Sequence, residues 1–120
     1  MFNFGTFLLM QSPSMRSSQE IYSRAVDIAQ AAETLGFRNV WLAEHHFSPY
    51  GYLSRPAQLA TFLAAKTTTL RVGTAVIVVP LHHPLVVAEE IATISTTSSS
   101  AWGSSWTARG RAGRNRSTSS

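Results

Sequence analysis

The sequence lacks cysteine altogether, which excludes disulfide bonds, thiolate nucleophiles and cysteine-based zinc sites. It also lacks an apolar stretch of the roughly 18 residues that a membrane span needs. The apolar residues 2–10 follow no basic segment and run directly into Gln11 and Ser12, so they do not form a signal peptide. We therefore expect a cytoplasmic protein without a membrane segment.

Acidic residues are missing from residues 95–120, whereas basic and acidic residues balance in residues 1–94. The net charge of +4 thus arises from the C-terminal segment, which is rich in serine, arginine and glycine and has no hydrophobic periodicity. Such composition is typical of a disordered tail. A basic nucleic-acid-binding arm is the alternative. We favour the tail, because the composition changes inside a predicted helix rather than in a loop.

Before this tail, three short apolar runs alternate with three amphipathic stretches. The apolar runs predict strands at residues 2–10, 39–43 and 70–79, the last buried on both faces. Helices are predicted after each strand. The first begins at a capping box of Ser17 and Glu20 and ends at Gly36, the second begins at Pro56 after Ser54 as a possible cap, and the third spans residues 84–94.

An order of β, α, β, α, β, α indicates a parallel α/β sheet, either open and doubly wound or closed into a barrel. Three strands do not decide between these architectures. Single glycines at Gly51 and Gly73 mark turns or places where the backbone is approached closely.

All four histidines lie just after predicted strands, where parallel α/β proteins bind their ligands. Glu44, His45 and His46 follow the second strand, and His82 and His83 follow the third. Neighbouring histidines of an extended segment point to opposite sides, so a His-His pair is a poor chelate, and we predict no metal site. A general acid or base is the better interpretation. Glu44 either orients one of the histidines or pairs with a basic residue.

These segments also resemble a known family, the luciferase-like flavin-dependent monooxygenases. The resemblance covers residues 2–94 and rests on four segments in order, namely FGTFLL, GFRNVWLAEHHFSPYG, LRVGTAVIVVPLHHP and VVAEEIATI. It implies the first three units of a TIM-like (β/α)8 barrel that is usually a homo- or heterodimer. It also implies oxidation of a small organic substrate by dioxygen with reduced FMN, or alternatively the deazaflavin F420, and a flavin reductase as the partner that supplies the reduced cofactor.

The resemblance also assigns residues. It implies that His45 is the catalytic acid or base, and we predict Glu44 as the second catalytic residue. It places the cofactor near Thr74, Ala75, Val76 and His82, with a non-proline cis peptide between Ala75 and Val76.

The family pattern stops after Ile94, and the Gly-x-Gly-Arg-Gly segment that helps to hold flavin phosphate in the family is absent from this sequence. A full barrel takes roughly 250 residues. We therefore expect residues 1–94 to be an inactive fragment of such an enzyme, and a reading-frame shift near codon 95 is our hypothesis for residues 95–120. Two other hypotheses stay open: a metal-dependent barrel hydrolase, and a non-enzymatic fragment with a nucleic-acid-binding tail.

Overall fold

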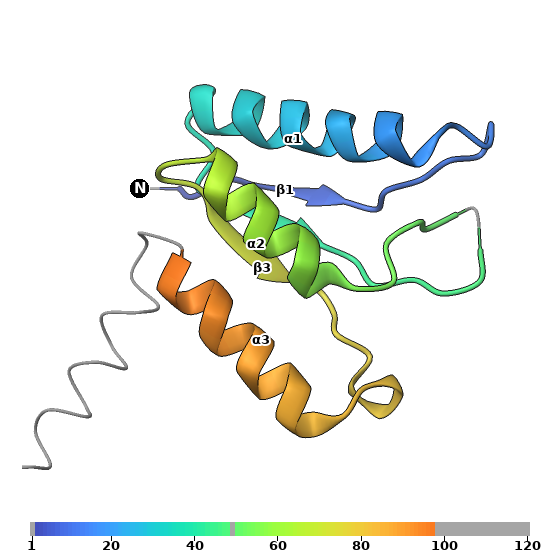
Figure 1. The fold of residues 1–120 in the computed structure, drawn as a ribbon. Coiled ribbons are helices and arrows are strands. Elements are labelled where there is room, and N and C mark those ends of the chain that lie inside the picture. Colours follow the sequence, from blue (N-terminus) through green and yellow to red (C-terminus); the bar gives the residue numbers. More distant parts are fainter. Residues whose placement is uncertain (1, 49, 98–120) are drawn as a thin grey trace, which may run out of the picture.

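A computed structural model of the chain describes residues 2–48 and 50–97 (Figure 1). The three strands form one parallel sheet in the order β1-β2-β3, so the predicted alternation of strands and helices is confirmed. The elements are β1 (Gly5–Leu8), α1 (Ser18–Thr34), β2 (Asn39–Leu42), α2 (Pro56–Lys66), β3 (Arg71–Thr74), a 3₁₀ turn (Val79–Leu81) and α3 (Pro84–Thr97).

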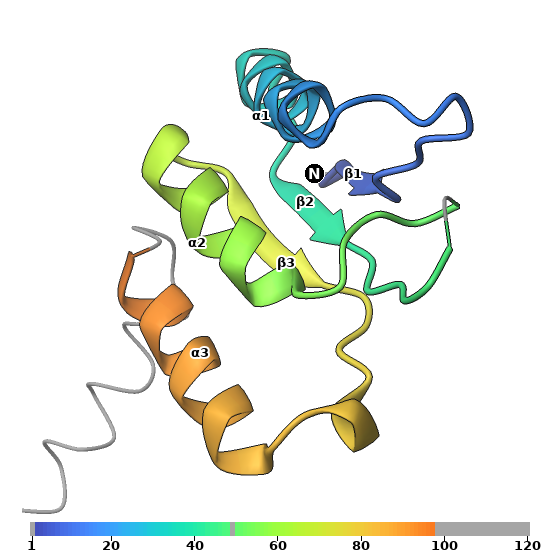
Figure 2. The same cartoon turned by 45° about the vertical axis from the view of Figure 1, so that its right-hand side comes forward.

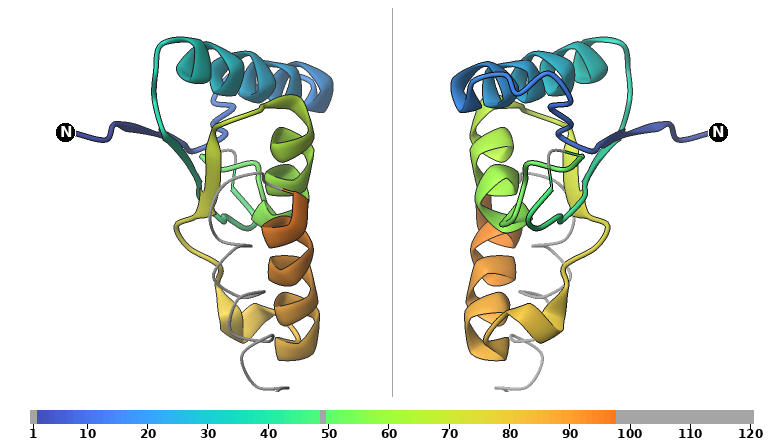
Figure 3. Two further views of the ribbon diagram at one scale, coloured as in Figure 1. Left: turned by 90° about the vertical axis from the view of Figure 1, so that its left-hand side faces the viewer. Right: turned by 90° about the vertical axis from the view of Figure 1, so that its right-hand side faces the viewer.

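The two faces of this sheet differ sharply in burial. Helices α2 and α3 lie on one side of the strands (Figure 3), and α1 lies beside β1 (Figure 2). Val40 and Leu42 of β2 are fully buried, whereas Trp41 between them is 43% exposed. Because alternate residues of a strand point to opposite faces, the helices cover one face, and the described residues leave the other face open.

A single hydrophobic core fills the space between the covered face and the helices. Small and branched apolar side chains dominate it, and helix α1 contributes two alanines, Ala25 and Ala29, at helical spacing. The core residues are Leu8, Met10, Ile21, Ala25, Ala29, Val40, Leu42, Leu53, Ala57, Leu59, Ala60, Leu63, Leu70 and Ile94. This core ties together all three β/α units and thereby fixes the positions of the strand ends.

The observed strands are shorter than predicted. The first covers only Gly5–Leu8, and Phe2 and Phe4 before it are exposed rather than buried. Strand β3 ends at Thr74 instead of residue 79, and it is not buried on both faces. The pairing with β2 extends only to Ala75, whose N–H donates to the Leu42 carbonyl at 2.8 Å. Farther along, Val78 N–H donates to the Glu44 carboxylate instead of to a strand. Apolar composition alone did not reveal this change of partner.

The helix ends agree with the predictions in part. Ser17 caps α1 by accepting a hydrogen bond from Glu20 N–H, but the Glu20 carboxylate pairs with Arg16 rather than completing the capping box. Gly36 follows α1 with a φ of +83°, the left-handed conformation expected there.

Helix α2 begins at Pro56 as predicted, but Ser54 is not its cap. The N-cap position is Arg55, and its side chain makes no capping hydrogen bond. Arg55 instead reaches across to His82 and Glu90.

Helix α3 continues to Thr97, three residues beyond its predicted end at residue 94. The rest of the predicted tail lies outside the described residues. Among the helices that are described, none combines the length and the apolar character needed to cross a membrane.

Candidate active site at the strand ends

Glu44 is the centre of a hydrogen-bonded cluster at the carboxyl end of β2. Its side chain is fully buried, and Oε1 lies 2.6 Å from His46 Nε2 and 2.7 Å from His82 Nε2. Its second oxygen, Oε2, accepts the backbone N–H of Val78 at 2.9 Å. The carboxylate thus joins the end of β2 to the segment that follows β3, and both carboxylate oxygens have partners.

These contacts keep Glu44 ionised. Burial by itself raises the pKa of this carboxyl group, but the hydrogen bonds from His46, Val78 N–H and His82 outweigh that effect and bring the pKa below its ordinary value of 4.5. A negative charge without direct solvent contact is therefore stable at this rim at neutral pH.

His82 has a second partner on its other ring nitrogen. Nδ1 lies 2.6 Å from the Arg55 guanidinium, which also forms an ion pair of 2.9 Å with Glu90. The side chain of His82 is only 5% exposed. The sequence alone suggested no role in the site for Glu90 or for Arg55. Both were missed because the partners are 27 and 35 residues apart, and only the tertiary fold brings them together.

His45, the predicted catalytic residue, stands apart from this cluster. Its backbone N–H donates to the Leu53 carbonyl at 2.8 Å, and its ring packs edge-on against Tyr50 with centroids 5.6 Å apart. Nε2 of His45 is buried and has no hydrogen-bond partner among the described residues. The structure does not bring Glu44 and His45 into side-chain contact, so Glu44 orients His46 and His82 instead.

Gly51 leaves the space that the His45 ring occupies. A Cβ atom at position 51 would overlap the imidazole ring, so only glycine leaves room for it. Ser48 and Gly51 form an isolated antiparallel β-bridge. The prediction that Gly51 marks a close approach is confirmed, and the group that approaches is His45.

The predicted cofactor-binding segment leaves the end of β3 beside this cluster. Thr74 is paired with Leu42 of β2, and the peptide between Ala75 and Val76 is cis, as the resemblance implied. Val76 is 63% exposed, whereas Thr74 and Ala75 are half-buried. Four of the predicted residues, Thr74, Ala75, Val76 and His82, therefore lie on one stretch of chain next to Glu44.

Three potential ligand atoms meet in the cluster. One atom each from Glu44, His46 and His82 lie within 4.8 Å of one another. Neighbouring histidines such as His45 and His46 form a poor chelate, but the fold combines His46 with His82 from the other pair. Sequence spacing gave no signal for this combination.

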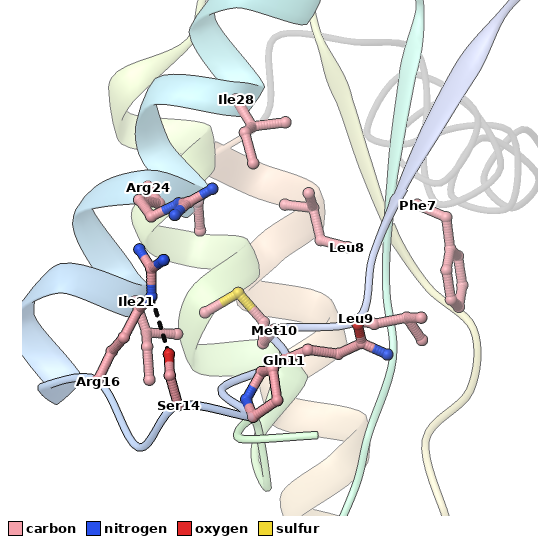
Figure 4. Close-up of a pocket in the computed structure, with 12 residues that line it drawn as sticks. Phe7, Leu8, Leu9, Met10, Gln11, Ser14, Arg16, Ile21, Arg24 and Ile28 are labelled. Atoms are coloured by element: carbon pink, nitrogen blue, oxygen red, sulfur yellow. Dashed lines mark hydrogen bonds between the residues drawn. The ribbon is translucent and has the colours of Figure 1, made fainter. Parts of the chain in front are cut away.

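A separate hollow of about 430 Å³ lies between β1 and α1, away from the histidines (Figure 4). Met10, Ile21 and Ile28 form its apolar wall, and Arg16 and Arg24 border it. Arg16 donates to Ser14 at 3.3 Å. None of the predicted site residues lines this hollow, so it does not belong to the candidate site.

Comparison with known proteins supports the resemblance. The profile of the luciferase-like monooxygenase family matches residues 2–99. An alkanal monooxygenase alpha chain from the Kryptophanaron alfredi symbiont is 41% identical over 88 residues, which are 73% of this chain and 25% of that protein. A luciferase-like monooxygenase of Escherichia coli (strain K12) is 38% identical over 93 residues, which are 78% of this chain and 28% of that protein.

Solved structures agree in fold. Monooxygenase RslO1 from Streptomyces bottropensis is 29% identical with a TM-score of 0.75, over 81% of this chain and 30% of that one. The oxygenating constituent of 3,6-diketocamphane monooxygenase from Pseudomonas putida, in complex with FMN, is 19% identical with the same TM-score of 0.75, over 79% of this chain and 26% of that one. The chain spans about a quarter of the length of these curated relatives. With the family profile covering most of its residues, the chain belongs to the luciferase-like monooxygenase family, and its fold is part of a TIM-type barrel.

Proposed function

We propose that this chain provides part of the flavin-binding rim of a monooxygenase, in which His45 acts as the general acid or base. One observation carries the proposal: Nε2 of His45 is buried yet has no partner among the described residues. A buried polar atom without a partner is costly, so a group that binds beside it would gain a hydrogen bond. Imidazole is also the side chain best suited to move protons near neutral pH.

The residues around this rim fit a flavin ring. Val76 is largely exposed beside the ionised Glu44 cluster, and Trp41 is exposed on the open face of the sheet. An isoalloxazine ring is flat and carries polar atoms along its edges, so it needs an apolar surface and a few hydrogen-bonding groups. A bound reduced flavin supplies the electrons for the activation of dioxygen, and the protein supplies position and protons.

His45 and Glu44 have different roles at this rim. Nε2 of His45 gives or takes the proton. The His45 ring packs against Tyr50 and occupies the space that a Cβ atom at position 51 would fill. Glu44 has no free oxygen, because His46, His82 and Val78 use both. We therefore assign Glu44 a positioning role: it joins the end of β2 to the segment that carries Ala75 and Val76.

Reduced FMN is our choice of cofactor, with F420 as the alternative, and a flavin reductase would supply it. For the substrate we propose a small organic molecule, since one group of relatives is named as alkanal monooxygenase alpha chains. We further propose that the complete assembly is a homo- or heterodimer in the cytoplasm.

A chimeric enzyme tests the role of His45. Residues 1–94 of this chain would replace the matching segment of the Escherichia coli relative, which supplies the remaining barrel units. We expect His45→Gln to lower turnover by about 10²- to 10⁴-fold, the usual contribution of a general acid or base, with flavin binding nearly unchanged. His83→Gln is the matched control, because His83 is exposed and lies outside the cluster. Equal turnover in both variants would contradict the proposal.

The isolated chain tests the fragment hypothesis. We propose that the 120-residue chain by itself neither binds reduced FMN tightly nor turns over, because its sequence lacks the phosphate-binding segment of the family. An anaerobic titration followed by flavin fluorescence anisotropy measures this directly. Tight binding, or any oxygenation of a long-chain aldehyde, would overturn this part of the proposal.

A further inference from the structure

We infer that Arg55 is a positioning residue that fixes the tautomer of His82 and so reserves the Glu44 cluster for hydrogen bonding rather than metal ligation. The two ring nitrogens of His82 face different neighbours. Nδ1 faces the Arg55 guanidinium at 2.6 Å, and Nε2 faces Glu44 Oε1 at 2.7 Å.

The position of the proton on His82 follows from what its neighbours are able to do. A guanidinium has only N–H donors and keeps its charge at all accessible pH values, so Nδ1 of His82 must accept. A neutral imidazole that accepts at Nδ1 carries its hydrogen on Nε2. His82 therefore donates from Nε2 to Glu44, which is the arrangement that an ionised carboxylate requires.

Arg55 is itself held in place for this task. Its second guanidinium nitrogen pairs with Glu90 of α3 at 2.9 Å, and the two side chains are 36% and 25% exposed. Arg55 lies immediately before α2, so one side chain connects the start of α2, the loop after β3 and α3. The planar guanidinium contacts both partners with different nitrogens, a geometry that lysine does not reproduce.

The same arrangement opposes metal binding, although the spacing of Glu44, His46 and His82 would suit an ion. A histidine that binds a metal through one nitrogen normally donates the N–H of the other to a carboxylate or carbonyl. Here the group that faces Nδ1 of His82 is a cationic donor. A metal at Nε2 would need both ring nitrogens without hydrogen, or would need the Arg55 contact to break.

The fixed hydrogen bonds of His82 and Glu44 also limit proton transfer at the rim, a step that rests on the proposed function. Glu44 and His82 are both saturated by fixed hydrogen bonds, so neither is available to exchange protons with a bound molecule. His45 then stands as the imidazole with a free buried nitrogen beside a rigid, negatively charged support.

Nuclear magnetic resonance of the histidine side chains tests the tautomer in the purified chain without flavin. Long-range ¹H–¹⁵N correlation distinguishes a pyrrole-type from a pyridine-type nitrogen, and single histidine variants assign the signals. We expect a pyrrole-type Nε2 and a pyridine-type Nδ1 for His82. In Arg55→Met the Nδ1–H form should appear, and Arg55→Lys should restore the original pattern in part. Arg24→Met is the control, because Arg24 lies on α1 at the other hollow.

A titration with Zn²⁺ alone tests the second half of the inference. We expect the wild-type chain and Arg24→Met to bind Zn²⁺ at least 10-fold more weakly than Arg55→Met, since groups around metal ligands commonly change affinity by about 10- to 100-fold. Glu90→Gln, which keeps Arg55 but removes its anchor, should give an intermediate affinity. A wild-type His82 with hydrogen on Nδ1, or equal Zn²⁺ affinity in wild type and Arg55→Met, would overturn the inference. Failure of the chimera test would leave these two measurements unaffected.

Discussion

Glu33 offers a specific test of how the β/α units are joined, because one of its carboxylate oxygens accepts several hydrogen bonds from a single turn. Oε1 accepts the backbone N–H groups of Thr68, Thr69 and Leu70 at 2.8, 2.5 and 2.9 Å, and also the Thr69 hydroxyl at 3.0 Å. These hydrogen bonds join the last turn of α1 to the turn that leads into β3. The backbone N–H of Thr69 is the main reason that the pKa of Glu33 lies below 4.5.

The structure sets the size of the effect. A hydrogen bond to a charged group contributes about 1.5–3 kcal/mol when it is shielded from water. Thr68 and Thr69 are exposed, so water can hydrogen-bond to their N–H groups when the carboxylate is removed, and the net loss is smaller. We therefore expect Glu33→Ala to destabilise the chain by about 1–2 kcal/mol, similar to the loss of a helix cap. Glu33→Gln keeps an acceptor but no charge, and about half of that loss should follow.

The dependence on pH makes the test specific to the carboxylate. Because the folded-state pKa of Glu33 is lowered, its stabilisation is fully present above pH 4.5 and is lost as the pH falls through the folded-state pKa. Urea unfolding followed by circular dichroism should show the gap between wild type and Glu33→Gln at pH 7, and the gap should close toward pH 3. Asp27→Asn, an exposed change on the same helix, should show no such gap. A gap that is absent at pH 7, or unchanged at low pH, would contradict this role of the Glu33 carboxylate.

Three further substitutions test local features. Gly51→Ala should push the His45 ring out of its place, which a shift of the His45 resonances and a drop in turnover of the chimera would report. Gly73→Ala would bring a Cβ atom 2.6 Å from the Trp41 ring, so we expect a loss of about 1–3 kcal/mol in urea unfolding and a changed near-UV circular dichroism spectrum. Ser17→Ala removes the cap of α1 and should cost about 1 kcal/mol by the same unfolding assay, whereas unchanged stability would contradict the capping role.

The order of elements and the rim position of the histidines could be predicted because they depend on local patterns. Helical spacing around Ala25 and Ala29, the cap at Ser17 and the turn at Gly36 are written within a few residues of chain. The rule that parallel strands direct their ligand sites to one edge then placed Glu44 and the histidines correctly at the strand ends.

The partners within the site could not be predicted, because they depend on distances through space. Glu44 contacts His46 and His82 rather than His45, and nothing in adjacent letters separates these options. Arg55 reads as an ordinary surface residue before a helix until α3 brings Glu90 beside it. The predicted end of β3 was wrong for a related reason. An apolar run resembles a strand even where a backbone N–H in it donates to a carboxylate, as Val78 N–H does to Glu44.

The parallel register of the three strands also governs how copies of this chain would meet. In the described residues no strand pairs with the outer edge of β1 or of β3. The edges of β1 and β3 are different surfaces whose strands run in the same direction. A copy that pairs its β1 with the β3 of another copy therefore continues the sheet, and the edge of its own β3 stays unpaired. Contacts of this head-to-tail kind do not end after two copies unless the rotation closes a ring. Self-association of this chain should therefore grow with concentration as a series of oligomers rather than stop at a symmetric dimer.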